Sequence, residues 1–184
     1  MVKTNSEVSF DLGLIAIIRT KTADEARSAA RAVIAAGVNV IEFTSTTPAV
    51  FDLIEEFSSD TSNKHIHVGL GTAMNRSHVL SSKDAGAKFV ISPHVCQEVI
   101  EATNQAGLIS IPGVASPTEV ADALRFGADI LKFFPASSLG PKYLKSVCDP
   151  FPGNTWVATG GISIDTIEEW VLAGVSGFGI GSLL

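Results

Sequence analysis

Residues 88–135 read KFVISPHVCQEVIEATNQAGLISIPGVASPTEVADALRFGADILKFFP. Short apolar runs alternate in this stretch with longer amphipathic segments. The apolar runs have the length and composition of buried strands, and the segments between them have the spacing of helices. We expect strands at 88–92, 108–113 and 129–135, and helices at 95–106 and 117–126. Strands that alternate with helices in this way predict a parallel sheet.

The same alternation continues on both sides of this stretch. A threonine cap and a C-terminal glycine delimit a helix at 22–37, and Pro48 stands at a permitted first-turn position of the next one. The further strands are expected at 14–19, 39–44, 67–72, 155–161 and 177–182. The further helices are expected at 22–37, 48–58, 76–86, 141–148 and 164–173.

Eight strand–helix units predict an α/β fold, a closed (β/α)8 TIM barrel that residues 1–184 form as a single domain. An open doubly wound sheet is the alternative architecture. The chain stops at Leu184, soon after the eighth strand. We therefore expect the final covering helix of the barrel to be missing or truncated.

Composition restricts the classes of function. Charged residues make up 17% of the chain, below the roughly 25% of an ordinary soluble domain, so much of the chain should be buried. A net charge of −6 disfavours nucleic acid as a partner, but helix ends still allow a phosphorylated small molecule. Cys96 and Cys148 are isolated, which indicates a reducing compartment. Without an apolar run long enough for a signal peptide or a membrane span, we expect a soluble, cytoplasmic protein with no membrane partner.

Polar residues interrupt the apolar strands near their carboxyl ends. Side chains of a barrel strand alternate between the interior and the helix layer, which groups Ile130 with Lys132 and Phe134 on the sixth strand. The same parity turns Val68 and Leu70 inward on the third. Active sites of this fold lie at the carboxyl ends of the strands. The polar residues expected there, inside the barrel, are Arg19, Glu42, Thr72 and Lys132.

A charged residue inside a barrel is costly unless it is paired or used. Desolvation lowers the pKa of a lysine, and a neutral Lys132 amine can attack a ketone to form a Schiff base. Glu42 can then serve as general acid or base, directly or through water. This chemistry needs no metal and no cofactor, and we interpret His65, His67, His78 and His94 as rim or supporting residues. A solvated rim position, or a structural Lys132–Glu42 salt bridge, remains the alternative.

Glycines follow the seventh and eighth strands, in ATGGIS (158–163) and GIGS (179–182). Loops at these two positions form the usual phosphate site of a barrel, and glycines let backbone N–H groups approach an anion. A helix starting near Ser163 would add its positive end. Ordinary turn glycines are the alternative. The candidate phosphate ligands are Gly160, Gly161, Gly181 and Ser182.

Several segments together resemble a known family. They are VIEFTSTTP, VGLGTAMN, AGAKFVISPHV, IPGVASPTEV, LKFFPASSLGPKYLK and ATGGIS. In this order they are similar to segments of the 2-keto-3-deoxy-6-phosphogluconate aldolases and their 6-phosphogalactonate relatives, from about Leu14 to Ser182. The resemblance implies a class I aldolase, usually a homotrimer, that releases pyruvate and glyceraldehyde 3-phosphate from a phosphorylated keto acid. Cleavage of 4-hydroxy-2-oxoglutarate and the preferred epimer stay open.

The resemblance also implies roles for single residues. Lys132 matches the Schiff-base lysine, Glu42 the acid–base glutamate and Thr72 the threonine that holds the pyruvate carboxylate. Arg19 matches an arginine of many relatives, especially of the galactonate type, and PASSLGPKYLK is closer to that type. Thr46 stands where many gluconate-type members have an arginine. The matches to pocket-lining residues are Pro93, Phe134 and Thr159, and the matches to the phosphate site are Gly160, Gly161, Gly181 and Ser182.

Two other functions compete with this interpretation. A phosphate-binding barrel epimerase or isomerase would share the glycine loops, but it would not need Lys132 within a strand. A non-catalytic subunit that binds a phosphorylated ligand would fit a shortened barrel, but it would not need both Lys132 and Glu42. Turnover with carbon–carbon cleavage distinguishes the aldolase from both.

Overall fold

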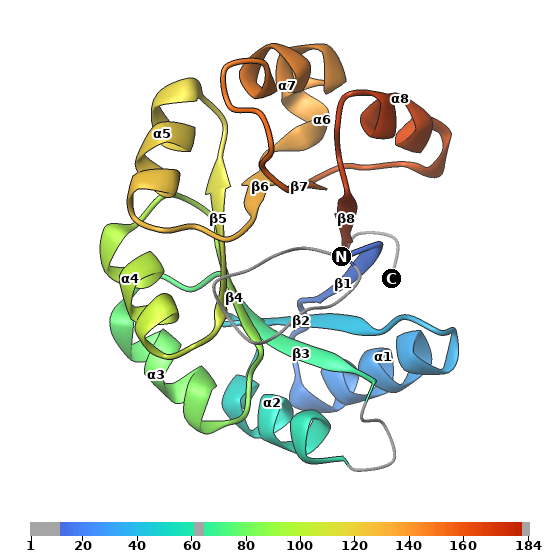
Figure 1. Cartoon of the computed structure of the whole chain (residues 1–184). Helices are drawn as coiled ribbons and strands as arrows, with labels where there is room; N and C mark the ends of the chain where they lie inside the picture. Colours follow the sequence, from blue (N-terminus) through green and yellow to red (C-terminus); the bar gives the residue numbers. More distant parts are fainter. Residues whose placement is uncertain (1–11, 61–64, 182–184) are drawn as a thin grey trace.

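The computed structural model describes residues 12–60 and 65–181. Eight parallel strands close into a barrel in chain order, and the last strand pairs with the first. Figure 1 shows the strands at the centre with the helices outside them. The strands are β1 Leu14–Ile18, β2 Val40–Thr44, β3 His67–Gly71, β4 Phe89–Ser92, β5 Ile109–Val114, β6 Leu131–Phe133, β7 Trp156–Thr159 and β8 Gly177–Ile180. The predicted (β/α)8 barrel is confirmed, and the open sheet is excluded.

The helices follow the strands as the alternation predicted. Reciprocal capping boxes begin two of them, Thr22 with Glu25 before α1 and Ser116 with Glu119 before α5. The helices are α1 Ala23–Ala35, α2 Val50–Ser59, α3 Arg76–Asp84, α4 Gln97–Gln105, α5 Pro117–Arg125, α6 Ala136–Leu139, α7 Pro141–Cys148 and α8 Ile167–Leu172.

Three local expectations differ from the structure. Pro48 does not begin α2, because Ala49 has a left-handed φ of 55° and the helix starts only after it. The helix expected from residue 164 begins as a 3-10 turn, Ile164–Thr166, before α8. The short helix α6 was not predicted, because four residues are too few to show a helical period.

Buried apolar side chains form two clusters under the helices and a third inside the barrel. The outer clusters lie on the faces of the strands that carry, for example, Phe43 and Phe133. The inner cluster fills the lower part of the barrel with bulky side chains, as the fold requires. Its members are Leu12, Ile15, Val40, Phe89, Ile91, Ile109, Ile111, Ile130 and Val157.

The inward parity predicted for β3 is wrong. Val68 and Leu70 belong to the outer cluster under the helices, so Gly69 and Gly71 face the interior. A Cβ at Gly69 would collide with the Phe89 ring, and one at Gly71 would collide with the Glu42 carboxylate. The interior is already occupied at this strand, and only glycine fits there.

Some expectations fall outside the described residues. They are the phosphate role of Ser182 and the state of the covering helix after β8. Across 12–60 and 65–181, the structure has no helix with the length and apolar character that crossing a membrane requires.

Candidate active site

Lys132 projects from β6 into the barrel, one step above the inner apolar cluster. Its side chain is 7% exposed, and its Nζ lies 4.9 Å from the centre of the Phe134 ring. Burial lowers the pKa of the Lys132 amine, the Glu42 carboxylate opposes that shift, and the Arg19 guanidinium adds to it. The net direction is downward, so the neutral and nucleophilic form of the amine is favoured.

Glu42 projects from β2 into the same space and is 2% exposed. Burial raises the pKa of its carboxyl group, although the positive charges of Lys132 and Arg19 act in the opposite direction. Its Oε2 atom has no hydrogen-bond partner in the described structure. An unsatisfied buried carboxylate oxygen is costly for stability, and such groups are concentrated at functional sites.

A structural salt bridge does not explain these two residues. The four ion pairs within 4.0 Å found among the described residues involve Arg27, Arg31 and Arg125 on the outer helices. Lys132 and Glu42 influence each other's pKa across the barrel without being joined at that distance.

Arg19 and Thr72 meet at the mouth of the barrel. The Nη2 of Arg19, just after β1, donates to Oγ1 of Thr72 at 3.1 Å. Strand alternation does not explain the position of Thr72. This residue comes after the end of β3, and its backbone has a left-handed φ of 56°. Because its hydroxyl accepts from Arg19, the hydroxyl hydrogen is available for a bound anion.

Four successive hydroxyl residues, 44–47, follow closely after Glu42 in the chain, and their contacts were not predicted from the sequence. The Oγ1 of Thr44 lies 3.0 Å from that of Thr46 and 3.2 Å from that of Thr47, which donates to the Ile18 carbonyl at 3.3 Å. Ser45 donates through Oγ to the Thr72 carbonyl at 2.7 Å. The run of hydroxyl residues after strand two in VIEFTSTTP was the available signal, but spacing alone gave it no partners.

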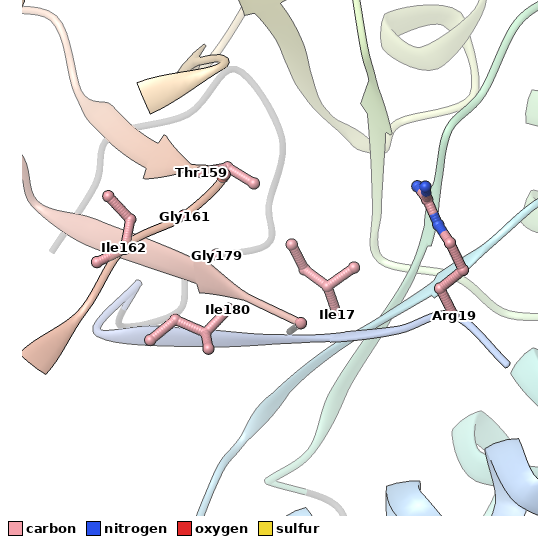
Figure 2. Close-up of a pocket in the computed structure, with 9 residues that line it drawn as sticks. Ile17, Arg19, Thr159, Gly161, Ile162, Gly179 and Ile180 are labelled. Atoms are coloured by element: carbon pink, nitrogen blue, oxygen red, sulfur yellow. The ribbon is translucent and has the colours of Figure 1, made fainter. Parts of the chain in front are cut away.

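A cavity of about 380 Å³ opens at the carboxyl ends of β1, β7 and β8, and Arg19 lines it, whereas Lys132 and Glu42 do not. Figure 2 shows the Ile17 side chain between Arg19 on one side and Thr159 and Gly179 on the other. The glycine-rich loops therefore share one cavity with Arg19, which also contacts Thr72. The residues that line it are Ile17, Arg19, Thr159, Gly160, Gly161, Ile162, Gly179, Ile180 and Gly181.

The loop after β7 requires glycine twice in succession. Gly160 and Gly161 have φ values of 99° and 72°, which side chains with a Cβ rarely adopt. A Cβ at Gly161 would also collide with the side chain of Ser137 on α6. The backbone N–H of Ser137 donates to the Gly160 carbonyl at 2.9 Å, so α6 holds this loop in place.

Phe134 lies close to the lysine, and Pro93 lies against the neighbouring strand β5. The Phe134 ring contacts both the Lys132 amine and the backbone at Gly160, where a Cβ would be 3.3 Å from the ring. The Pro93 carbonyl lies against Gly113, which pairs with Lys132 across β5 and β6. Phe134 therefore borders the amine, and the Pro93 carbonyl lies beside the strand that pairs with it.

No metal centre is found in the part of the chain that the structure describes. No three His, Cys, Asp or Glu side chains there are grouped so that they could hold an ion. His67 begins β3, at the end of the barrel opposite to Thr72. Burial, with smaller effects of Lys88 and His65, lowers the pKa of its imidazole.

The family model of the KDPG and KHG aldolases matches residues 7–184. The chain belongs to this aldolase family. It is therefore related to carbon–carbon lyases, and family membership speaks against the epimerase and against the non-catalytic subunit.

Individual aldolases are similar over almost the whole chain. A 2-dehydro-3-deoxy-6-phosphogalactonate aldolase of Escherichia coli is 34% identical over 93% of this chain and 83% of its own. A 2-dehydro-3-deoxy-phosphogluconate aldolase of Pseudoalteromonas atlantica is 35% identical over 92% of this chain and 79% of its own.

A solved aldolase bears on the chemistry. The KDPG aldolase of Legionella pneumophila, with pyruvate captured as a covalent carbinolamine intermediate, superposes with a TM-score of 0.83. It is 32% identical and covers 92% of this chain and 82% of its own. A carbinolamine is the adduct that precedes a Schiff base, so that aldolase binds pyruvate covalently as class I chemistry requires.

Proposed function

We propose that this aldolase cleaves a 2-keto-3-deoxy-6-phospho sugar acid, of the gluconate or galactonate type, through a Schiff base on Lys132. The observation that carries the proposal is the pair formed by Lys132 and Glu42. Both are buried inside the barrel, and burial favours the neutral amine and the neutral acid. A neutral amine is the nucleophile that this chemistry needs.

The reaction begins when the Lys132 amine attacks the C2 carbonyl of the keto acid. Glu42, in the acid form that burial favours, protonates the carbinolamine hydroxyl, which leaves as water, so that a protonated imine and a Glu42 carboxylate remain. Glu42, directly or through a water molecule, removes the proton of the C4 hydroxyl, and the C3–C4 bond breaks as the C4 aldehyde forms. The electron pair of that bond moves into the imine and gives an enamine. Protonation at C3 and hydrolysis then release pyruvate and the free lysine.

The two anionic ends of the substrate have separate candidate sites. The Thr72 hydroxyl and the Arg19 guanidinium are proposed to bind the C1 carboxylate, since charge-assisted hydrogen bonds favour an anion there. Pro93, Phe134 and Thr159 are proposed to line the space between the two ends. The phosphate is proposed to bind at the backbone of Gly160, Gly161 and Gly181, and at Ser182, which lies outside the described residues.

We propose a homotrimer from the resemblance and a cytoplasmic location from the isolated cysteines. A homotrimer would appear as three times the chain mass of 19.2 kDa in light scattering of the purified protein. A single-chain mass would contradict it. A cytoplasmic location agrees with the isolated cysteines and can be checked by cell fractionation.

Product analysis tests the proposal. The purified protein is incubated with each of the two epimeric phosphorylated keto acids, and pyruvate is measured with lactate dehydrogenase. Release of pyruvate and glyceraldehyde 3-phosphate in equal amounts from at least one epimer is expected. If neither epimer is cleaved, the substrate assignment is wrong. Incubation with 4-hydroxy-2-oxoglutarate decides whether a second keto acid is also cleaved.

A further inference from the structure

Ser45 follows β2 and lies against the turn by which the chain leaves β3. Its backbone N–H donates to the Gly71 carbonyl at 2.8 Å. Its Oγ donates to the next carbonyl, that of Thr72, at 2.7 Å. One residue of the neighbouring strand therefore holds two successive carbonyls of this turn.

Thr72 is the residue in this turn whose backbone needs support. Its φ of 56° lies in the left-handed region, which a residue with a Cβ rarely occupies and a β-branched one least of all. Such conformations persist where the surroundings determine them. Besides Ser45, the carbonyl of Ile91 holds the turn by accepting from the Ala73 N–H at 3.0 Å.

The conformation of Thr72 determines where its side chain lies. In this conformation its Oγ1 accepts from Arg19 at 3.1 Å, and the preceding Gly71 leaves room for the Glu42 carboxylate. An extended Thr72 would direct its hydroxyl elsewhere and would leave Arg19 without this contact. The turn therefore connects the Arg19–Thr72 pair with the acid–base side chain.

We propose that Ser45 is a positioning residue for carboxylate binding. Its hydroxyl holds Thr72 in the left-handed conformation that presents the Thr72 hydroxyl and the Arg19 guanidinium to the substrate. This role rests on the proposed function, in which those two groups bind the C1 carboxylate. It concerns ground-state binding of the keto acid, so it should affect substrate affinity more than the rate of the covalent steps.

The test uses pyruvate, which carries the carboxylate and the ketone but no phosphate. Borohydride reduces the adduct of pyruvate with the enzyme, and the labelled fraction is measured against pyruvate concentration. In Ser45→Ala the pyruvate concentration for half-maximal labelling should rise about fivefold, the size of one neutral hydrogen bond. At saturating pyruvate the label should still be on Lys132. The kcat for cleavage of the phosphorylated keto acid should stay within about twofold of its normal value.

Three further variants separate positioning from stability. Ser45→Thr keeps the hydroxyl and should restore the normal half-maximal concentration. Ser45→Cys has a side chain of similar size but only a weak S–H donor. Its pyruvate concentration for half-maximal labelling should therefore rise as in Ser45→Ala. If Ser45→Ala does not fold, Ser45→Cys tests the role of the hydroxyl in its place. Ser82→Ala is the matched control, because Ser82 is fully buried and donates to the Val79 carbonyl at 2.8 Å within α3. It should leave labelling unchanged.

Two results would overturn the role of Ser45. One is an unchanged half-maximal concentration in Ser45→Ala and Ser45→Cys. The other is an equal rise in Ser82→Ala, which would trace the effect to stability. Failure of the normal enzyme to be labelled at all would instead count against the Schiff base on Lys132, so the two proposals fail in different ways.

Discussion

The lower and the upper parts of the barrel interior are built by the same strands but have opposite chemistry. Val40 and Glu42 are two residues apart on β2, and Ile130, just before β6, is two residues from Lys132. The lower side chains form a close-packed apolar cluster, whereas the upper ones are ionisable groups whose pKa values burial shifts towards the neutral form. The lower part stabilises the fold, and the upper part uses some of that stability to hold reactive groups out of water.

The strongest test of this division removes the amine. Lys132→Ala should lower the rate of cleavage by about 10⁴-fold or more, since no other group can form the imine. Binding of a phosphorylated ligand and the melting temperature should be kept, because Lys132 forms no ion pair within 4.0 Å among the described residues. Steady-state kinetics and calorimetry measure both, with the exposed Lys145→Ala as control. Substantial turnover by Lys132→Ala would overturn the mechanism.

The next largest effect is expected at the carboxylate. Glu42→Gln should slow cleavage by about 10²–10⁴-fold, the range of a general acid–base group. Its labelling by pyruvate and borohydride should persist, because the amine is still present. The exposed Glu98→Gln on α4 is the control. A near-normal rate in Glu42→Gln would remove Glu42 from this role.

A substitution in the lower part should give the reverse result. Ile111 is fully buried in the inner cluster, and Ile111→Ala should reduce the free energy of unfolding by about 2–5 kcal/mol. The kcat of the folded fraction should be nearly normal. Denaturant unfolding and kinetics on the same sample check this. A loss of kcat without a loss of stability would show that the two parts of the interior are not separate in function.

A smaller effect is expected in the glycine loop. Gly161→Ala places a Cβ at a φ of 72° and against Ser137, so the KM for the phosphorylated keto acid should rise about tenfold, the loss of one or two hydrogen bonds. Labelling by pyruvate, which has no phosphate, should be unchanged. Gly153→Ala is the matched control, since its φ is 82° but the space around it is open. If Gly161→Ala weakened pyruvate labelling as much as binding of the phosphorylated keto acid, the phosphate site would not lie at this loop.

The smallest effect is expected on the pH dependence of labelling by pyruvate and borohydride. Arg19 lowers the pKa of the Lys132 amine and Glu42 raises it. The neutral amine reacts, so labelling at saturating pyruvate rises with pH through that pKa. Arg19→Met should move the rise to higher pH, and Glu42→Gln should move it to lower pH. A shift of the rise in labelling to the same side of the pH axis in both variants would contradict this electrostatic account.

Sequence reasoning predicted the barrel, and it placed Lys132 and Glu42 in its interior, because alternation and strand ends are local signals. It failed at β3, where Gly69 and Gly71 face the interior. Their orientation depends on the Phe89 ring and the Glu42 carboxylate, which come from other strands. The left-handed Thr72 and its contact with Ser45 could not be predicted either, since they depend on neighbouring turns that only the closed barrel brings together.

The central claim is that Lys132 forms the covalent intermediate, and one measurement tests it most directly. The purified protein is treated with pyruvate and borohydride, digested, and mapped by peptide mass. The account predicts one reduced pyruvate adduct, on Lys132, that disappears when pyruvate or borohydride is omitted. An adduct on another lysine, or no adduct on the folded protein, would contradict it.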